Sequence, residues 1–202
     1  MKELVVGVTG SIACYKACDV VSTLRKEAEV NLHVVMTAEA TRFVSPLTFQ
    51  TLSGNRVYSD VFELPEEWDL LHTSLSSKAD LVLVCPATLN LISKFTHGIC
   101  DDLLTCTLFA TKAPILLVPA MNRAMYEHPV TQENIARLKR IGVQFIGPIH
   151  GELACRQVGM GHIAEVMDIV AEVRRWLHNA QSPAPASGSK RAARSSGKKR
   201  KR

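Results

Sequence analysis

Short apolar runs alternate along the chain with segments in which apolar residues recur at helical spacing. The apolar runs, which are rich in β-branched residues, cover 4–8, 30–36, 81–85, 115–118 and 143–146. The helical stretches between or after them cover 13–24, 88–96, 101–110, 130–140 and 165–178. Strands that are apolar on both faces and separated by helices are typical of a parallel sheet. The pattern therefore predicts a single-domain α/β fold, a doubly wound parallel sheet with helices on both faces.

The charge of the chain divides it into a domain, 1–181, and a basic tail, 182–202. Eight of the 24 Lys and Arg residues lie in the tail, and no acidic residue follows Glu172. Removing those eight charges turns the formal net charge of +5 into −3. The tail lacks apolar periodicity, so we expect it to be disordered. It suits contact with nucleic acid, an anionic surface or a nuclear import receptor, and a merely solvated or processed tail is the simpler interpretation.

Composition also excludes several classes of protein. No apolar run reaches the roughly 18 residues that a membrane helix needs, and the N-terminus lacks the apolar core of a signal peptide. The six cysteines are scattered without a CxxC pair. That distribution favours reduced thiols over a disulfide framework or a zinc site. We therefore expect a cytoplasmic protein without a metal centre or a membrane association.

Four loops are expected at the carboxyl ends of the predicted strands, where doubly wound sheets bind ligands. They are TGSIA (9–13), TAEAT (37–41), PATLN (86–90) and PAMNRAM (119–125). Two of them begin with proline directly after a strand, where the missing N–H is expected to end the ladder. All four combine small residues with a hydroxyl or an amide. Together they predict one shallow cleft that offers backbone N–H groups and few charges.

The residues of these loops favour a mononucleotide over a dinucleotide. GVTGSIA joins a strand to a helix, and backbone N–H groups at a helix start suit a phosphate. A plain tight turn explains that loop equally well, since it is not GxGxxG. Thr37 ends the second strand, where a dinucleotide site would carry an acid for the ribose. With Ser11 and Thr88 at neighbouring strand ends, a ligand with a phosphate and a ring is the favoured interpretation.

The remaining polar candidates have structural as well as chemical interpretations. His72 precedes a strand among apolar neighbours, which fits a structural histidine or a catalytic one. Cys155 lies in GELACRQVGMGHIAE, a glycine-rich stretch that fits a loop and a movable lid, with a thiol that is either buried or reactive. Asp101 and Asp102 are best placed to open a helix. No histidine or third carboxylate is spaced to complete a metal site with them.

Taken in order, these segments resemble the flavin-dependent cysteine decarboxylases over about residues 3–178. The segments are GVTGSIA, TAEAT, SPLTFQTLSG, the stretch around His72, PATLN, GICDDLLT, PAMNRAMYEHP and GELACRQVGMGHIAE. Among these segments, the PxMNxxM element and the LACxxxGxG stretch are the most specific to this family. The resemblance implies an FMN cofactor and decarboxylation of 4'-phosphopantothenoylcysteine to 4'-phosphopantetheine in coenzyme A biosynthesis. It implies a thioaldehyde formed by hydride transfer to the flavin as the electron sink for loss of CO2.

The resemblance also implies roles for individual residues. The residues implied to hold FMN are Gly10, Ser11, Ile12, Thr37, Ala38, Glu39, Thr88, Leu89, Asn90, Leu91 and Ala120. The implied catalytic residues are His72, which assists proton transfer in the oxidative half-reaction, Asn122, which holds the substrate carboxylate, and Cys155, the acid of the lid. Glu152 and Ala154 are implied to contact the substrate together with Asn122.

The chain departs from the family pattern at a few positions. Arg156 and Gln157 follow the lid cysteine, where the family usually has glycine and often an acid. A stiffer lid is expected to close more slowly or to recognise phosphate differently. Leu89 replaces a common alanine, which is expected to crowd the edge of the flavin, and Tyr126 replaces a frequent tryptophan.

Family resemblance further implies a homo-oligomer, a trimer or a dodecamer, with the flavin between subunits. It implies a separate ligase chain, because few residues follow the last predicted helix. Three related activities remain as alternatives. These are a peptidyl-cysteine decarboxylase, a flavin prenyltransferase, and a non-catalytic flavin-binding regulatory subunit that binds a phosphatase. Neither of the last two needs the trio of His72, Asn122 and Cys155.

Overall fold

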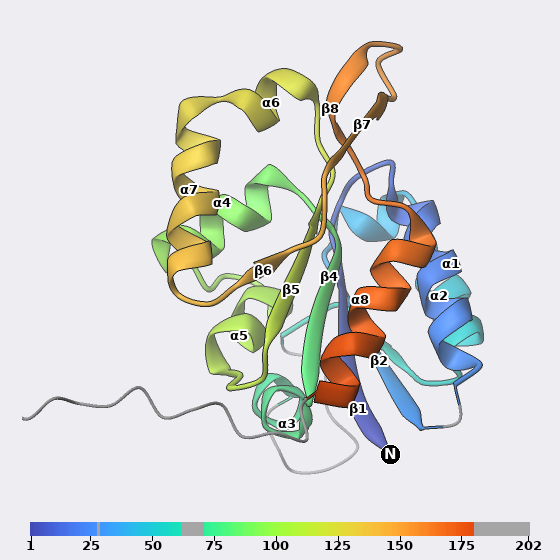
Figure 1. Cartoon of the computed structure of the whole chain (residues 1–202). Coiled ribbons are helices and arrows are strands. Elements are labelled where there is room, and N and C mark those ends of the chain that lie inside the picture. Colours follow the sequence, from blue (N-terminus) through green and yellow to red (C-terminus); the bar gives the residue numbers. More distant parts are fainter. Residues whose placement is uncertain (28, 62–70, 180–202) are drawn as a thin grey trace, which may run out of the picture.

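The computed structural model describes residues 1–27, 29–61 and 71–179 of the 202-residue chain (Figure 1). The basic tail predicted at 182–202 lies outside the described residues, as does the domain boundary at 181. No helix among the described residues is long and apolar enough to cross a membrane.

Six parallel strands form the central sheet, in the order β3-β2-β1-β4-β5-β6 (Figure 1). The strands are β1 (Lys2–Val8), β2 (Val30–Met36), β3 (Val57–Tyr58), β4 (Leu81–Ala87), β5 (Ile115–Pro119) and β6 (Gln144–Phe145). The chain runs outward from β1 to β3, returns to the middle, and then runs outward from β4 to β6. The order therefore reverses between β1 and β4, the point at which such sheets bind ligands.

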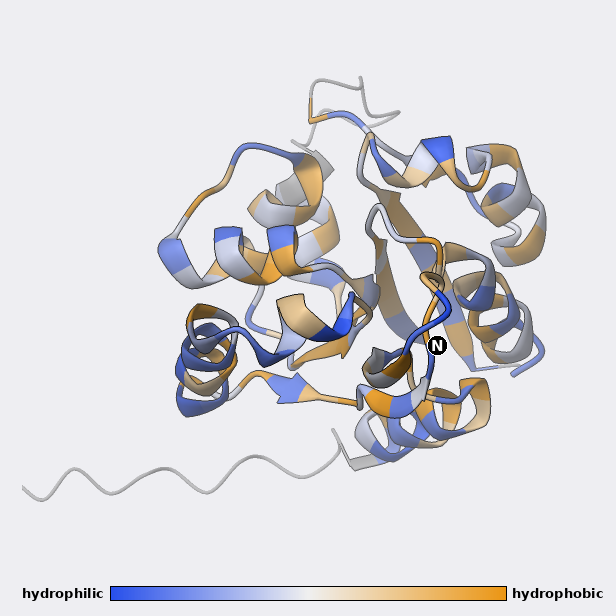
Figure 2. Cartoon of the chain, turned by 90° about the horizontal axis from the view of Figure 1, so that it is seen from above, coloured by the Kyte–Doolittle hydropathy of each residue, from blue (hydrophilic) through white to orange (hydrophobic). Residues whose placement is uncertain are grey.

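Helices cover both faces of the sheet, as predicted. One face carries α1 (Cys14–Arg25), α2 (Pro46–Ser53) and α8 (Val166–Asn179), and the other α3 (Leu71–Lys78), α4 (Leu89–His97), α5 (Leu103–Ala110) and α7 (Pro129–Arg140). Side chains of one strand alternate between the faces. Leu4, Val6 and Val8 enter the core under α1 and α8, whereas Val5 enters the core under α4 and α5. Figure 2 shows the largely hydrophobic strands between these two helical layers. The fold prediction is confirmed.

Two features near the carboxyl ends differ from the expectation. Pro86 does not end its strand: it lies inside β4, and the pairing with β5 shifts register between Val84 and Ala87. The ladder thus tolerates the proline where its missing N–H falls at an irregularity. The glycine-rich stretch expected as a loop is instead an antiparallel hairpin of β7 (Ile149–Glu152) and β8 (Val158–His162). Together with the short helix α6 (Arg123–Glu127), the hairpin stands over the carboxyl ends of the strands (Figure 1).

A close approach between α5 and β1 yields a stability prediction. Leu104 is 1% exposed, and a Cβ added at Gly7 would lie 2.5 Å from its Cδ1 atom, so the helix packs directly on the strand backbone. We expect Leu104→Ala to lower the free energy of unfolding by about 2–5 kcal/mol, because it leaves a cavity in a close-packed core. Urea denaturation measures the change. Leu47→Ala, at a position 67% exposed, is the matched control and should change little; an equal loss in both variants would contradict this packing.

Candidate active site

Two adjoining clefts open at the carboxyl ends of the strands. The first has a volume of about 320 Å³ and is lined by Thr9, Gly10, Ser11, Thr37, Glu39, Thr88, Leu89, Asn90, Leu91, Lys94, Asp102, Ala120, Met121 and Met125. The second has a volume of about 600 Å³ and is lined by Ser11, Ile12, Ala13, Tyr15, Lys16, Ala120, Met121, Asn122, Glu152, Leu153, Ala154, Cys155, Gly161, His162 and Ile163. Ser11, Ala120 and Met121 line both clefts, so a ligand in one lies directly beside a ligand in the other.

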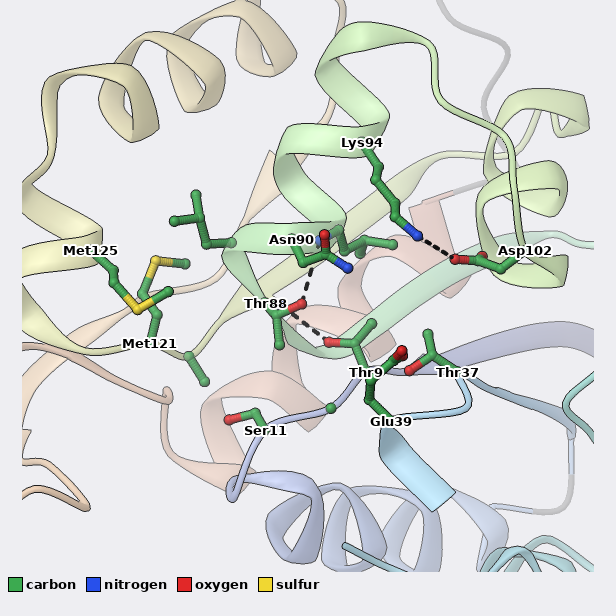
Figure 3. A pocket seen from close by; sticks show the side chains of 14 residues that line it. Thr9, Ser11, Thr37, Glu39, Thr88, Asn90, Lys94, Asp102, Met121 and Met125 are labelled. Atoms are coloured by element: carbon green, nitrogen blue, oxygen red, sulfur yellow. Dashed lines mark hydrogen bonds and ion pairs between the residues drawn. The ribbon is translucent and has the colours of Figure 1, made fainter. Parts of the chain in front are cut away.

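Thr9 fastens the ends of the two central strands together at the floor of the first cleft. Its buried hydroxyl donates to the Pro86 carbonyl at 2.7 Å and accepts from the Thr88 N–H at 3.1 Å (Figure 3). Thr88 in turn caps α4, since its hydroxyl accepts from the Leu91 N–H at 3.4 Å. The loops after β1 and β4 are thereby held side by side at the switch point of the sheet.

Gly10 brings the loop after β2 to the same place. A Cβ at this glycine would lie 2.4 Å from the Cβ of Glu39, so any other residue would push the two loops apart. Thr37 opens the second of these loops, and its hydroxyl accepts from the Ala40 N–H at 3.3 Å. All four predicted loops thus contribute to one cleft.

Three charged residues line the first cleft: Glu39, Lys94 and Asp102. Figure 3 shows Met121 and Met125 at one side and the pair of Lys94 and Asp102 at the other. The ammonium of Lys94 lies 2.8 Å from an oxygen of Asp101 and 3.3 Å from one of Asp102. Hydrogen bonding to Asp101 raises the pKa of Lys94, with Asp102 adding to it, and the lysine lowers the pKa of Asp101.

Asp102 also opens α5, as the sequence predicts. Its side chain accepts from the Thr105 N–H at 2.8 Å, while the Thr105 hydroxyl accepts from the Asp102 N–H at 3.1 Å, a capping box. The pairing with Lys94 was missed, because it joins two helices whose relative placement has no signature in the sequence. No group of three or more His, Cys, Asp or Glu residues in the described ranges is arranged to hold a metal ion.

Asn122 and Cys155, predicted from distant segments, meet in the second cleft. The Oδ1 atom of Asn122 caps α6 by accepting from the Ala124 N–H at 2.8 Å. Its Nδ2 atom donates to the Sγ atom of Cys155 at 3.5 Å. The hydrogen bond to the helix orients the Asn122 amide, and the turn between β7 and β8 brings the Cys155 thiol next to it.

Cys155 differs from the thiols beneath the clefts in its access to solvent. It is exposed, whereas Cys14 and Cys85 are buried in the core. Burial raises the pKa of both buried thiols, that of Cys85 to about 12. Cys155 is therefore the cysteine in this region that is open to a ligand.

Glycines seat the hairpin against the loop after β5. Gly161 has a φ of 132°, and a Cβ there would lie 2.2 Å from the Met121 carbonyl oxygen. Its own carbonyl accepts from the Met121 N–H at 3.1 Å. At Gly159, a Cβ would lie 2.5 Å from the Cδ atom of Arg123. The glycines that suggested a loop thus allow the hairpin to pack closely against Met121 and Arg123.

Arg156 adopts a φ of 61° in the hairpin turn. This left-handed conformation costs a residue with a side chain about 1–2 kcal/mol relative to glycine. We expect Arg156→Gly to raise the free energy of unfolding by about 1 kcal/mol, measured by urea denaturation. Arg123→Gly is the control: it puts a glycine inside the helix α6, where glycine is unfavourable, and should lower the free energy of unfolding. A loss of stability in Arg156→Gly would contradict the assigned strain.

Three of the predicted site residues do not line the cleft that the sequence analysis gave them. Ile12, predicted beside the cofactor, lines the second cleft, and Ala38 is exposed and lines neither. His72 is in the first turn of α3, which lies at the amino end of β4, away from both clefts (Figure 1). The side chain of His72 lies outside the described part of the structure, so its role stays a prediction. Lys16 and His162, which line the second cleft, were not predicted.

Comparison with known proteins assigns the chain to a family. The model of the family named Flavoprotein matches residues 1–178. The chain is 46% identical over 169 residues to the coenzyme A biosynthesis bifunctional protein CoaBC of Bacillus subtilis (strain 168), which covers 84% of this chain and 41% of that protein. It is 39% identical over 178 residues to a probable phosphopantothenoylcysteine decarboxylase of Streptococcus mutans, covering 87% of this chain and 99% of that protein.

A solved structure supports the same grouping. It is a PPC decarboxylase mutant complexed with pantothenoylaminoethenethiol, with a TM-score of 0.80 and 26% identity, and the match covers 88% of this chain and 98% of that one. The chain spans less than half the length of the bifunctional relatives that it matches. It belongs to the flavoprotein family, in the branch that includes phosphopantothenoylcysteine decarboxylase.

Proposed function

We propose that the chain is an FMN-dependent decarboxylase that converts 4'-phosphopantothenoylcysteine to 4'-phosphopantetheine in coenzyme A biosynthesis. One observation carries the proposal: the amide of Asn122 and the thiol of Cys155 meet at 3.5 Å in a cleft that shares a wall with a second cleft. In this proposal the amide orients the substrate carboxylate and the thiol is the acid, beside a cleft suited to a cofactor.

The first cleft fits FMN in size and lining. Its volume of about 320 Å³ lies within the usual range for ligand sites. The hydroxyls of Ser11, Thr37 and Thr88 suit the phosphate and ribityl chain, and Leu89 and Met121 offer apolar surface to a ring. The proposed FMN-binding residues in this cleft are Gly10, Ser11, Thr37, Glu39, Thr88, Leu89, Asn90, Leu91 and Ala120. Bound FMN supplies the acceptor and donor of a hydride, chemistry that no side chain offers.

The second cleft supplies the groups that act on the substrate. Asn122 has a second N–H on its amide for the substrate carboxylate, and a neutral donor orients that group without the counter-charge that would hold it against leaving. Cys155 delivers a proton to the product from its exposed thiol. Glu152 and Ala154, which line the same cleft, contact the substrate beside them.

The proposed role of His72 requires a second copy of the chain. The helix α3 lies at the amino end of β4, and this seven-residue strand is roughly 20 Å long. That distance is far beyond the reach of an imidazole side chain from its own helix to its own clefts. We infer a homo-oligomer, a trimer or a dodecamer, in which His72 of one subunit completes the site of another.

The setting of the reaction follows from its chemistry. The substrate must come from a ligase that joins cysteine to phosphopantothenate, and we place that ligase on a separate chain, and both in the cytoplasm. The bifunctional relatives are named for coenzyme A biosynthesis and are more than twice as long as the match.

The proposal is tested by purifying the full chain and recording its absorption spectrum. We expect a yellow protein whose extracted cofactor is FMN, and loss of one CO2 from phosphopantothenoylcysteine by mass spectrometry. A peptide with a C-terminal cysteine is the second substrate in the assay. Turnover of the peptide alone would replace the proposal by the peptide-modifying activity, and flavin without any turnover would replace it by the regulatory subunit.

A further inference from the structure

Lys16 and His162 face each other in the second cleft without a role in the chemistry above. The lysine is on α1, and the histidine ends β8. The Nζ atom of Lys16 lies 3.1 Å from the Nε2 atom of His162. Both residues are half-buried, and both line the cleft that also contains Asn122 and Cys155.

The hydrogen bonds of His162 indicate its tautomer. Its Nδ1 atom lies 2.8 Å from the carbonyl oxygen of Glu152, and a carbonyl can only accept, so Nδ1 carries the proton. The bare Nε2 atom then accepts from the ammonium of Lys16. Gly151 leaves room for the ring, since a Cβ there would lie 3.1 Å from the ring Cγ atom. His162 is therefore oriented to position the lysine.

Lys16 lacks a counter-charge in the described part of the chain. The ion pairs there join other residues, and none joins Lys16 to a carboxylate, including that of Glu152 in the same cleft. Lys16 is the only cation among the described residues of this cleft. An ammonium that is held by an imidazole in a ligand cleft, and is not paired with a carboxylate, is available to a bound anion.

We propose that Lys16, positioned by His162, is the phosphate subsite of the substrate cleft and determines the preference for a phosphorylated substrate. This inference rests on the proposed function. The substrate has a carboxylate at its cysteine end and a phosphate at the other end of its pantothenoyl chain. Asn122 binds the carboxylate, and Lys16 binds the phosphate. A peptide substrate has no phosphate and would leave the lysine unused.

The experiment compares phosphopantothenoylcysteine with its dephosphorylated form as substrates of the full-length holoenzyme. We expect the wild-type chain to prefer the phosphorylated form, and Lys16→Met to reduce the ratio of the two kcat/KM values by about tenfold or more. The loss should fall mainly on the phosphorylated form. Lys16→Arg should retain most of the preference, because it keeps the charge. Lys26→Met, at the exposed end of the same helix, is the matched control and should behave as wild type.

Lys16 also fastens the hairpin to α1 through His162, and this structural role makes a different prediction. If the contact only held the hairpin, Lys16→Met would slow both substrates equally and leave their ratio unchanged. That result would overturn the inference and leave the decarboxylase function intact. His162→Leu should lower the same ratio by a smaller factor, as expected of a positioning residue.

Failure of the proposed function has its own signature. A wild-type chain that decarboxylates neither form would reject that function. The subsite is then decided by calorimetric titration with 4'-phosphopantothenate and pantothenate. Phosphate-dependent binding in the wild type that is lost in Lys16→Met would still support the subsite, and equal affinity of both proteins for the phosphorylated compound, or no binding at all, would overturn it.

Discussion

Replacing Cys155 with serine is expected to stop formation of the normal product while CO2 is still released. A serine hydroxyl is a far weaker acid than a thiol, so the final protonation should slow by about 10²–10⁴-fold. The earlier steps do not require the thiol, so an oxidised enethiol should accumulate up to one equivalent of the bound flavin, which keeps the two electrons. Mass spectrometry of the reaction distinguishes the two products by their mass.

Cys100→Ser is the matched control for this variant. Cys100 is also exposed but lies outside both clefts, so its replacement should leave the product unchanged. Full conversion to the normal product by the Cys155→Ser variant would mean that another group provides the proton.

The second large effect is expected from Asn122→Asp, which separates folding from function. Aspartate caps a helix as well as asparagine does, so the bond to the Ala124 N–H and the melting temperature should be kept. The new carboxylate, however, faces the substrate carboxylate and lacks the N–H groups that would hold it. Like charges in contact cost several kcal/mol, and we expect kcat/KM to fall by about 10³-fold.

Asn122→Ser provides the comparison for this prediction. Serine also caps the helix and has no charge. The kcat/KM of the Asn122→Ser variant should therefore fall less, by about 10- to 100-fold, and this decrease should report the missing amide alone. An Asp variant that is as active as the Ser variant would show that the substrate carboxylate does not bind here.

The fold could be predicted from the sequence because its signals are local. Apolar runs such as that of β4 are buried on both faces, and the buried positions of α1 recur at helical spacing. The edge strand β3 was missed because its two residues are too short to form a pattern. The hairpin was missed because its glycines, which are typical of loops, serve close contacts with Met121 and Arg123.

The residues of the site also divide into those that local sequence signals could place and those that they could not. Residues at strand ends, such as Thr37 and Thr88, could be placed together because the carboxyl ends of parallel strands share one edge. The meeting of Asn122 with Cys155 came from family resemblance, since their segments are 33 residues apart. The pairs of Lys94 with Asp102 and of Lys16 with His162 had no signal at all, because each joins elements whose docking is decided by packing over the whole domain.

The hairpin of β7 and β8 forms a two-stranded sheet of its own, separate from the six-stranded one. Among the described residues it contributes to the second cleft but not to the first, whose walls come from segments that end at Met125. Under the proposed function, changes confined to this hairpin would alter which thiol-bearing acid is accepted and would leave the residues of the first cleft as they are. Exchange of the hairpin between relatives is the corresponding route for engineering new substrates.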